Sequence, residues 1–183
     1  MRDRGTTTGL TVWFTGLPSA GKTTLAKAVG ARLAERGHRV ELLDGDILRT
    51  HLTRDLGFSK EDRVENVLRV GFVAHLLSRN GVIVLCSLIS PHRETRDEVR
   101  RMHADRFMEV YVAAPVETCA ARDVKGLYAR QEAGDLRGLT GVDDPYEPPL
   151  DPEVVVPTES QSLPESVETV WQAFPGWVQD GER

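Results

Sequence analysis

The chain has 183 residues, the length of a single domain. Hydrophobic residues make up 40% of it and charged residues 28%, which excludes a chain that is disordered throughout. The net charge of −5 argues against a protein that binds nucleic acid through its phosphates, and no run approaches the ~18 apolar residues of a membrane span. We expect one domain over residues 1–183, with 1–8 and 179–183 flexible, and neither a nucleic acid nor a membrane as partner.

The two cysteines, Cys86 and Cys119, each lie in an apolar run and show no metal-ligand spacing. Buried free thiols are the simpler interpretation, and they suit a reducing compartment. The first eight residues lack the apolar stretch of a signal peptide. The sequence therefore predicts a cytoplasmic protein. The five histidines show no ligand spacing, and we expect them to be non-catalytic.

The first two predicted elements flank a glycine-rich turn. Residues 10–15 are apolar and β-branched, which predicts a buried strand, and residues 22–35 are rich in Ala, Leu and Lys, which predicts a helix. Between them, residues 16–23 fit G-x-x-x-x-G-K-[ST], the P-loop pattern. In this pattern backbone N–H groups surround phosphate oxygens, Lys22 reaches the β- and γ-phosphates, and the Thr23 hydroxyl ligates Mg²⁺.

We therefore expect ATP and Mg²⁺ as ligands of this loop. A chance match to the pattern is the alternative, but a strand before the loop and a helix after it are the context that a P-loop requires. The expected nucleotide-binding residues are Gly16, Leu17, Pro18, Ser19, Ala20, Gly21, Lys22, Thr23 and Thr24.

The second predicted strand carries acidic residues at its end. It covers residues 39–43 and is followed by the sequence Asp44-Gly45-Asp46. The two carboxylates are candidates for holding Mg²⁺ through water, or for orienting an acceptor hydroxyl and taking its proton. A solvated turn is the alternative, since Asp-Gly is common in turns.

Basic and acidic residues alternate around a helix predicted over residues 60–79, with Ser59 as its N-cap. Much of this pattern fits a solvated helix face with i,i+4 ion pairs. The same guanidinium groups can also bind an anionic substrate through paired hydrogen bonds. Phe58 is a candidate for stacking on a base, or alternatively for a hydrophobic staple. The arginines of this region are Arg49, Arg54, Arg63 and Arg69.

The most apolar run, residues 82–86, predicts a central strand that is buried on both faces. After it, Pro91 is expected to begin a helix that ends near residue 103, with Ser90 as the N-cap. The alternative is that the Ser90 hydroxyl faces an acceptor substrate.

The rest of the chain completes an alternating pattern. The segment 125–147 is polar and contains glycines, and a loop of this length is usually a lid or a binding segment. Because strands alternate with helices, the predicted fold class is α/β, a P-loop NTPase-type parallel sheet of about five strands with helices on both faces and a mobile lid. The remaining predicted strands are 107–112 and 154–156, and the remaining helices are 115–122 and 164–174.

Together these motifs resemble those of the adenylylsulfate kinases, over nearly everything from Gly9 to Phe174. The P-loop alone is not specific; the ordered set of motifs is. The matching segments are Thr15-Gly16-Leu17 with the P-loop, Asp44-Gly45-Asp46, Arg54-Asp55-Leu56-Gly57-Phe58-Ser59, Asp62-Arg63 with Glu65-Asn66, Ile89-Ser90-Pro91, Lys125-Gly126-Leu127-Tyr128, and Thr140-Gly141 through Asp144-Pro145-Tyr146-Glu147.

The resemblance implies transfer of the γ-phosphate of ATP to the 3′-hydroxyl of adenylyl sulfate, in sulfate assimilation or a related pathway, and it suggests a homodimer. It implies that Lys22 acts on the phosphates and that Asp46, supported by Asp44, orients and deprotonates the hydroxyl. In the family the serine matching Ser90 is a candidate phosphoserine intermediate, but direct in-line transfer needs only positioning and charge stabilisation. The residues that the resemblance assigns to the acceptor are Asp46, Arg49, Phe58, Arg63, Asn66, Ile89, Ser90, Lys125 and Leu139.

Five positions differ from the family's usual pattern. Ile47 and Thr53 replace asparagines, Leu139 replaces an aromatic residue that covers the adenine, and Leu68 and Ala129 replace basic residues. These changes are the basis for an alternative function, a kinase of the same fold that acts on a different nucleotide or small hydroxyl acceptor. A nucleotide-binding module without turnover is a third hypothesis, against which the complete set of phosphate-site residues argues.

Overall fold

The computed structural model describes residues 9–180. Five strands form one parallel sheet, as predicted, in the order β2-β3-β1-β4-β5. The middle strand is β1, and the apolar run predicted to be central forms β3, an interior strand beside it. The flexibility expected of residues 1–8 and 181–183 concerns residues outside the described part of the chain. The strands are β1 (Leu10–Thr15), β2 (Val40–Asp44), β3 (Ile83–Ser87), β4 (Phe107–Ala113) and β5 (Val154–Pro157).

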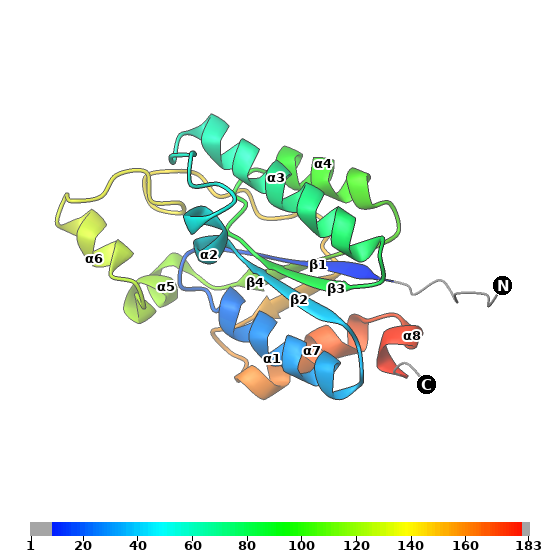
Figure 1. The fold of residues 1–183 in the computed structure, drawn as a ribbon. Coiled ribbons are helices and arrows are strands. Elements are labelled where there is room, and N and C mark those ends of the chain that lie inside the picture. Colours follow the sequence, from blue (N-terminus) through cyan, green and yellow to red (C-terminus); the bar gives the residue numbers. More distant parts are fainter. Residues whose placement is uncertain (1–8, 181–183) are drawn as a thin grey trace.

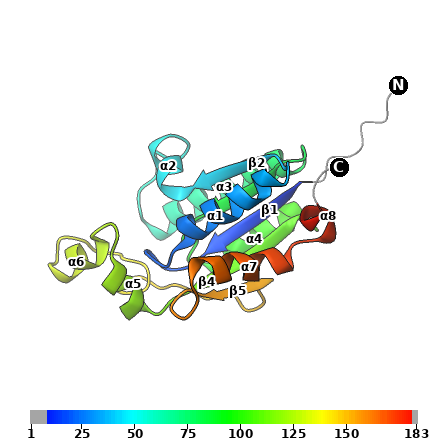
Figure 2. The same ribbon diagram turned by 90° about the horizontal axis from the view of Figure 1, so that it is seen from below.

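Helices cover both faces of this sheet. In Figure 1, α3 and α4 lie on one face and α1 and α7 on the other, while α2, α5 and α6 gather at the end of the sheet where the strands finish. Figure 2 shows the same arrangement from below, with α5 and α6 extending away from the sheet. The helices are α1 (Lys22–Glu35), α2 (Gly45–Thr50), α3 (Lys60–Ser78), α4 (Arg93–His103), α5 (Val116–Arg122), α6 (Leu127–Glu132), α7 (Leu163–Ala173) and α8 (Gly176–Gln179).

The core consists of two apolar layers, one on each face of the sheet. Successive residues of a strand point to opposite faces, so Phe14 packs into the layer that contains Leu25 of α1, and Trp13 packs into the layer that contains Val70 of α3 and Val99 of α4. Both β1 and β3 are buried at every residue, which explains why they are mostly apolar rather than alternating. This rigid centre holds the loops that follow the strands.

Both cysteines, Cys86 and Cys119, are free and buried, as predicted. Burial raises the pKa of each thiol above its usual value. Within residues 9–180, no helix combines the length and the apolar composition that crossing a membrane requires.

The N-cap prediction at the start of α4 was wrong. The cap is His92, not Ser90, and the helix begins at Arg93. Ser90 has φ 43°, a left-handed conformation, whereas a serine at a helix N-cap is typically extended, and its hydroxyl forms hydrogen bonds with Trp13 and Thr15 instead.

Three short helices were not predicted. Asp44 caps α2 by accepting a hydrogen bond from the backbone N–H of Asp46 at 3.0 Å, so the expected turn becomes a helix. Helix α8 includes Gln179, which was expected to fray but donates a side-chain hydrogen bond to the carbonyl of Phe174 at 2.7 Å. The segment predicted as a long loop also contains a helix, α6.

Candidate active site

The P-loop joins β1 to α1 and folds around its own lysine. The Lys22 ammonium group donates hydrogen bonds to the carbonyl of Gly16 at 2.9 Å and to that of Leu17 at 2.7 Å. Burial lowers the pKa of Lys22 to about 7; the charge of Lys125 lowers it further, while Asp46 is among the groups that oppose the shift. This lysine is therefore held where an anionic ligand would restore its charge.

Glycine is required at the first position of the loop. Gly16 has φ 151°, and a Cβ atom there would lie 2.5 Å from the carbonyl oxygen of Val112 on β4. The backbone of the loop thus passes directly over the neighbouring strand, which brings its N–H groups to the end of the sheet. The N-terminus of α1 follows at once, the usual site for phosphate in this kind of fold.

Three oxygen-bearing side chains meet beside the loop. The Thr23 hydroxyl donates to an Asp44 carboxylate oxygen at 2.8 Å and lies 3.0 Å from the Ser87 hydroxyl. Asp44 and Ser87 are adjacent in the sheet, since β2 and β3 pair with these two residues in register. Sequence reasoning missed Ser87; its position at the end of the most apolar strand was the signal that could have found it.

These oxygens suit a hard cation. Mg²⁺ takes hydroxyl, carboxylate and phosphate oxygens and keeps several waters, so it does not need a complete cage of protein ligands. Within residues 9–180, no group of three or more His, Cys, Asp or Glu residues could hold a metal ion by itself.

Asp46 stands apart from Asp44, although only one residue separates them. The turn of α2 sends the Asp46 carboxylate toward solvent and the cavity, where it forms an ion pair with Lys125 of the segment before α6. Two-thirds of the Asp46 side chain is exposed. The two aspartates therefore have different surroundings: Asp44 caps a helix beside Thr23, and Asp46 faces the open side.

Opposite the P-loop, a ring and two guanidinium groups form a second wall. The Phe58 ring is 69% exposed, and the guanidinium carbon of Arg49 lies 4.4 Å from the ring centre. Arg63 lies on the same ring at 5.8 Å and donates to the Phe58 carbonyl at 2.9 Å. Burial and the charge of Arg63 lower the pKa of Arg49. An exposed aromatic face with two neighbouring positive charges suits an anionic nucleotide.

Arg63 also connects this wall to residues 138–147, which we call the strap. Its guanidinium group donates to the Thr140 hydroxyl at 2.9 Å and to the Gly138 carbonyl at 2.7 Å, and it lies 3.5 Å from the Asp144 carboxylate. The side chain is nearly buried. Movement of the strap would therefore change the position of Arg63.

Asn66, one turn of α3 further along, has a fixed orientation. The Thr53 hydroxyl donates to the Asn66 side-chain oxygen at 2.7 Å. This contact occupies the amide oxygen and leaves the amide nitrogen as a donor at the cavity wall. Thr53, a departure from the family's usual pattern, thus makes a buried hydrogen bond of its own.

One cavity of about 360 Å³ joins these parts. Most of the predicted site residues line it: Pro18, Ser19, Gly21, Lys22, Thr23, Thr24, Asp44, Asp46, Arg49, Phe58, Arg63, Asn66, Ile89, Ser90 and Lys125. Seven lining residues were not predicted, namely Gly45, Val67, Ser87, Leu88, Pro91, Val124 and Leu127.

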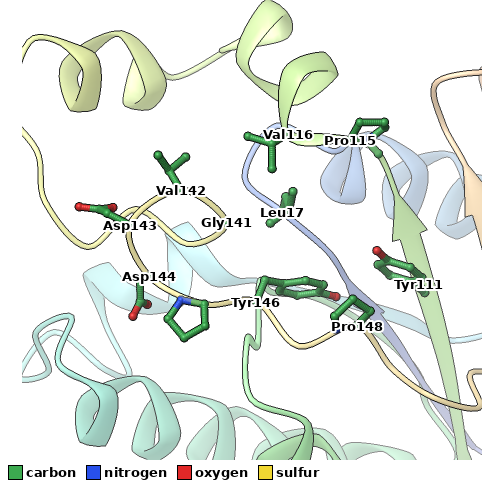
Figure 3. Close-up of a pocket in the computed structure, with 12 residues that line it drawn as sticks. Leu17, Tyr111, Pro115, Val116, Gly141, Val142, Asp143, Asp144, Tyr146 and Pro148 are labelled. Atoms are coloured by element: carbon green, nitrogen blue, oxygen red, sulfur yellow. The ribbon is translucent and has the colours of Figure 1, made fainter.

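Four predicted residues are not part of the cavity wall: Gly16, Leu17, Ala20 and Leu139. Leu139 is 5% exposed and packs in the core layer of α1 rather than facing the cavity. The Leu17 side chain contacts the strap at Gly141, since a Cβ atom added to Gly141 would lie 2.4 Å from the Leu17 Cδ2 atom. Leu17 lines a second cavity, of about 470 Å³, together with Tyr111, Tyr146 and other residues shown in Figure 3.

The middle strand of a parallel sheet leads into a P-loop, acidic groups lie at the end of β2, two strands away, and arginines line the same cavity. This arrangement defines a P-loop phosphotransferase. Comparison of the chain with known protein families narrows this class of enzyme. The sequence pattern of the family "Adenylylsulphate kinase" matches residues 8–157. The chain therefore belongs to the adenylylsulphate kinase family, as the motifs indicate.

Individual relatives agree with this assignment. The adenylyl-sulfate kinase of Picosynechococcus sp. is 59% identical over 162 residues, which cover 88% of this chain and 91% of that protein. The structure of the Mycobacterium tuberculosis APS kinase CysC in complex with AMPPNP and APS has a TM-score of 0.87 at 43% identity, covering 91% of this chain and 97% of that one. The hexameric APS kinase from Thiobacillus denitrificans has a TM-score of 0.70 at 39% identity, covering 92% of this chain and 29% of that one.

Proposed function

We propose that this protein transfers the γ-phosphoryl group of ATP to the 3′-hydroxyl of adenylyl sulfate, giving 3′-phosphoadenylyl sulfate, the activated sulfate donor. The observation that carries the proposal is the single cavity in which a P-loop lysine faces an exposed phenylalanine flanked by two arginines. Such a cavity can bring a phosphate donor and an acceptor hydroxyl close together. Membership of the family supports the choice of acceptor.

On the ATP side, we assign the loop from Gly16 to Thr24 to the phosphates. Its N–H groups and the N-terminus of α1 offer donors to phosphate oxygens, and Lys22 supplies the positive charge that the transferred group needs in the transition state. We assign Thr23 as a ligand of Mg²⁺, with Asp44 acting through water. When bound, Mg²⁺ neutralises charge on the β- and γ-phosphate oxygens.

On the acceptor side, we assign the Phe58 ring to stacking on the adenine. Arg49, Arg63 and the Asn66 amide then face the anionic part of the nucleotide. Asp46 is the residue that accepts the proton of the attacking hydroxyl. Its ion pair with Lys125 must separate or shift for this, because the lysine occupies the same carboxylate.

We propose that residues 125–147 act as a lid over this cavity. Lys125 contacts the proposed base and the strap contacts Arg63, so both ends of the segment touch the acceptor side. Closure over bound nucleotides would exclude water and limit hydrolysis of ATP.

A coupled assay of ATP turnover with adenylyl sulfate as acceptor and Mg²⁺ present tests the function. Asp46→Asn should lower kcat by about 10²–10⁴-fold, the usual contribution of a general base. Asp97→Asn is the matched control, since Asp97 is an exposed aspartate on α4, outside the cavity. ATP binding by calorimetry without turnover of adenylyl sulfate would reject this acceptor and favour a different nucleotide or small hydroxyl compound.

The homodimer and the cytoplasmic location stay proposals. The hexameric relative indicates that this family forms assemblies, and sedimentation of the purified chain measures its own state. The two buried free thiols suit a reducing compartment.

A further inference from the structure

A buried threonine just before the P-loop is the centre of a hydrogen-bond network that the proposed chemistry does not use. The hydroxyl of Thr15, the last residue of β1, lies 2.8 Å from the Ile89 carbonyl, 3.0 Å from the Ser90 hydroxyl and 2.9 Å from the Tyr146 hydroxyl. Thr15 is completely buried. Its three partners come from the loop after β3 and from the strap, both far from it in sequence.

Counting protons fixes the direction of every bond in this network. The indole N–H of Trp13 only donates, and it donates to the Ser90 hydroxyl at 3.0 Å. Ser90 donates its own proton to Thr15, and Thr15 donates its single proton to the Ile89 carbonyl. The Tyr146 hydroxyl must then donate to Thr15. Burial raises the pKa of Tyr146, which keeps this donor protonated.

The network holds a strained segment of the cavity wall. Ser90 has φ 43°, which costs free energy in a residue other than glycine. Its hydroxyl is held by Trp13 and Thr15, and its carbonyl accepts from the Arg96 guanidinium at 2.6 Å. Because Ile89 and Ser90 both line the cavity, the Thr15 hydroxyl sets the shape of that wall.

The same hydroxyl ties the wall to the strap. Tyr146 lies in the strap, and the next residue, Glu147, accepts from Arg96 through its carbonyl at 2.6 Å. Figure 3 shows the Tyr146 ring extending from the strap toward the strand that carries Tyr111. One hydroxyl group thus connects the end of β1, the cavity wall and the strap.

We infer that Thr15 is a positioning residue for the acceptor, whose hydroxyl holds the Ile89–Ser90 wall and the strap in the arrangement that binds adenylyl sulfate. The inference rests on the proposed function and deepens it. The Ser90 proton is committed to Thr15 and its oxygen accepts from Trp13, so Ser90 supports the wall rather than serving as a phosphate carrier.

The first test compares Thr15→Val with Thr15→Ser. Valine keeps the shape but leaves three polar groups without their partner, one of them the buried Ser90 hydroxyl, whereas serine keeps the hydroxyl. We expect Thr15→Val to raise the KM for adenylyl sulfate by about tenfold or more, with the KM for ATP changed less than about twofold, and Thr15→Ser to restore most of the acceptor KM. Equal effects of the two variants, or a Thr15→Val effect that is equal for both substrates, would overturn the inference.

The second test decides the matter even if Thr15→Val does not fold. Tyr146→Phe removes one donor to Thr15, and Tyr111→Phe is the matched control. The Tyr111 ring stacks on Tyr146 with centroids 6.1 Å apart, and its hydroxyl has no hydrogen-bond partner within the described part of the chain. Tyr146→Phe should raise the acceptor KM about threefold to tenfold, and Tyr111→Phe should leave it unchanged.

The wild-type enzyme in the same assay distinguishes failure of the role inferred for Thr15 from failure of the proposed function. An active wild type with an acceptor KM that is insensitive to Tyr146→Phe would overturn the role of Thr15 alone. A wild type that binds ATP but does not phosphorylate adenylyl sulfate would overturn the proposed function and, with it, this inference.

Discussion

The two walls of the cavity are built in different ways. The phosphate wall comes from one short stretch of the chain, residues 18–24, and its donors are mostly backbone groups at the start of one helix. The acceptor wall brings together residues of α2, α3, the segment before α3 and the loop after β3. The strap supports this wall through the hydrogen bond from Arg63 to Thr140, 77 positions away. A local backbone structure depends on few side chains, whereas an assembled wall depends on many contacts that each contribute a little.

The largest expected effect lies on the phosphate wall. Lys22→Ala should lower kcat about 10²–10³-fold, because it removes the only side-chain charge that the P-loop aims at the transferred group. Steady-state kinetics measure the loss. Lys27→Ala is the control, since Lys27 is exposed on the same helix. Comparable losses in the two variants would contradict the assignment of Lys22.

The acceptor wall should respond at Arg63. Arg63→Ala removes contacts to Phe58, Gly138 and Thr140 together, and we expect kcat/KM for adenylyl sulfate to fall about 10²-fold while ATP binding is retained. Arg69→Ala on the same helix is the control, because its ion pairs are exposed to solvent. Calorimetry with each nucleotide separates the two effects, and an equal loss of ATP affinity would argue against the separation of the walls.

The walls should also differ in their response to pH. Burial lowers the pKa of Lys22 to about 7 in the free protein, and bound phosphates raise it, so ATP binding takes up a proton above this pH. The Kd for ATP should therefore rise by up to about tenfold per pH unit above 7, whereas no such rise is expected for adenylyl sulfate. Calorimetry in buffers of different ionisation enthalpy measures the uptake, and Lys22→Arg, whose charge persists, should remove it.

The same pKa shift has a consequence for folding. Between about pH 7 and the ordinary value of 10.5, the unfolded chain holds a proton on Lys22 that the native chain has lost. The contribution of Lys22 to the free energy of unfolding therefore rises with pH across this window.

The smallest effect is expected at Thr53. Thr53→Val leaves the Asn66 oxygen without its donor and frees the amide to rotate, so the KM for adenylyl sulfate should rise about fivefold. Thr53→Ser keeps the hydroxyl and should stay close to wild type. If valine and serine behave alike, the orientation of Asn66 does not depend on this bond.

The differences between prediction and structure follow the division between the phosphate wall and the acceptor wall. The elements around the P-loop were predicted closely, because strand β1, the glycines and the first residues of α1 are specified by neighbours in the chain. Leu139 was expected to contact the acceptor because of its place in a motif, but an apolar side chain lowers its free energy by packing into the core. Ser90 was expected to cap a helix, a local role, and instead takes part in a network with β1.

The sequence by itself determined the α/β class, the P-loop and the family, because each rests on residues that are close together or on the order of motifs along the chain. Only the tertiary structure decided which side chains share the acceptor wall, that Ser87 joins Thr23 and Asp44, and that Thr15 links the wall to the strap. The reason is physical: a hydrogen bond is set by distance in space, and residues such as Thr15 and Tyr146, 131 positions apart, become neighbours only when the sheet has formed and the strap has packed against the end of β1.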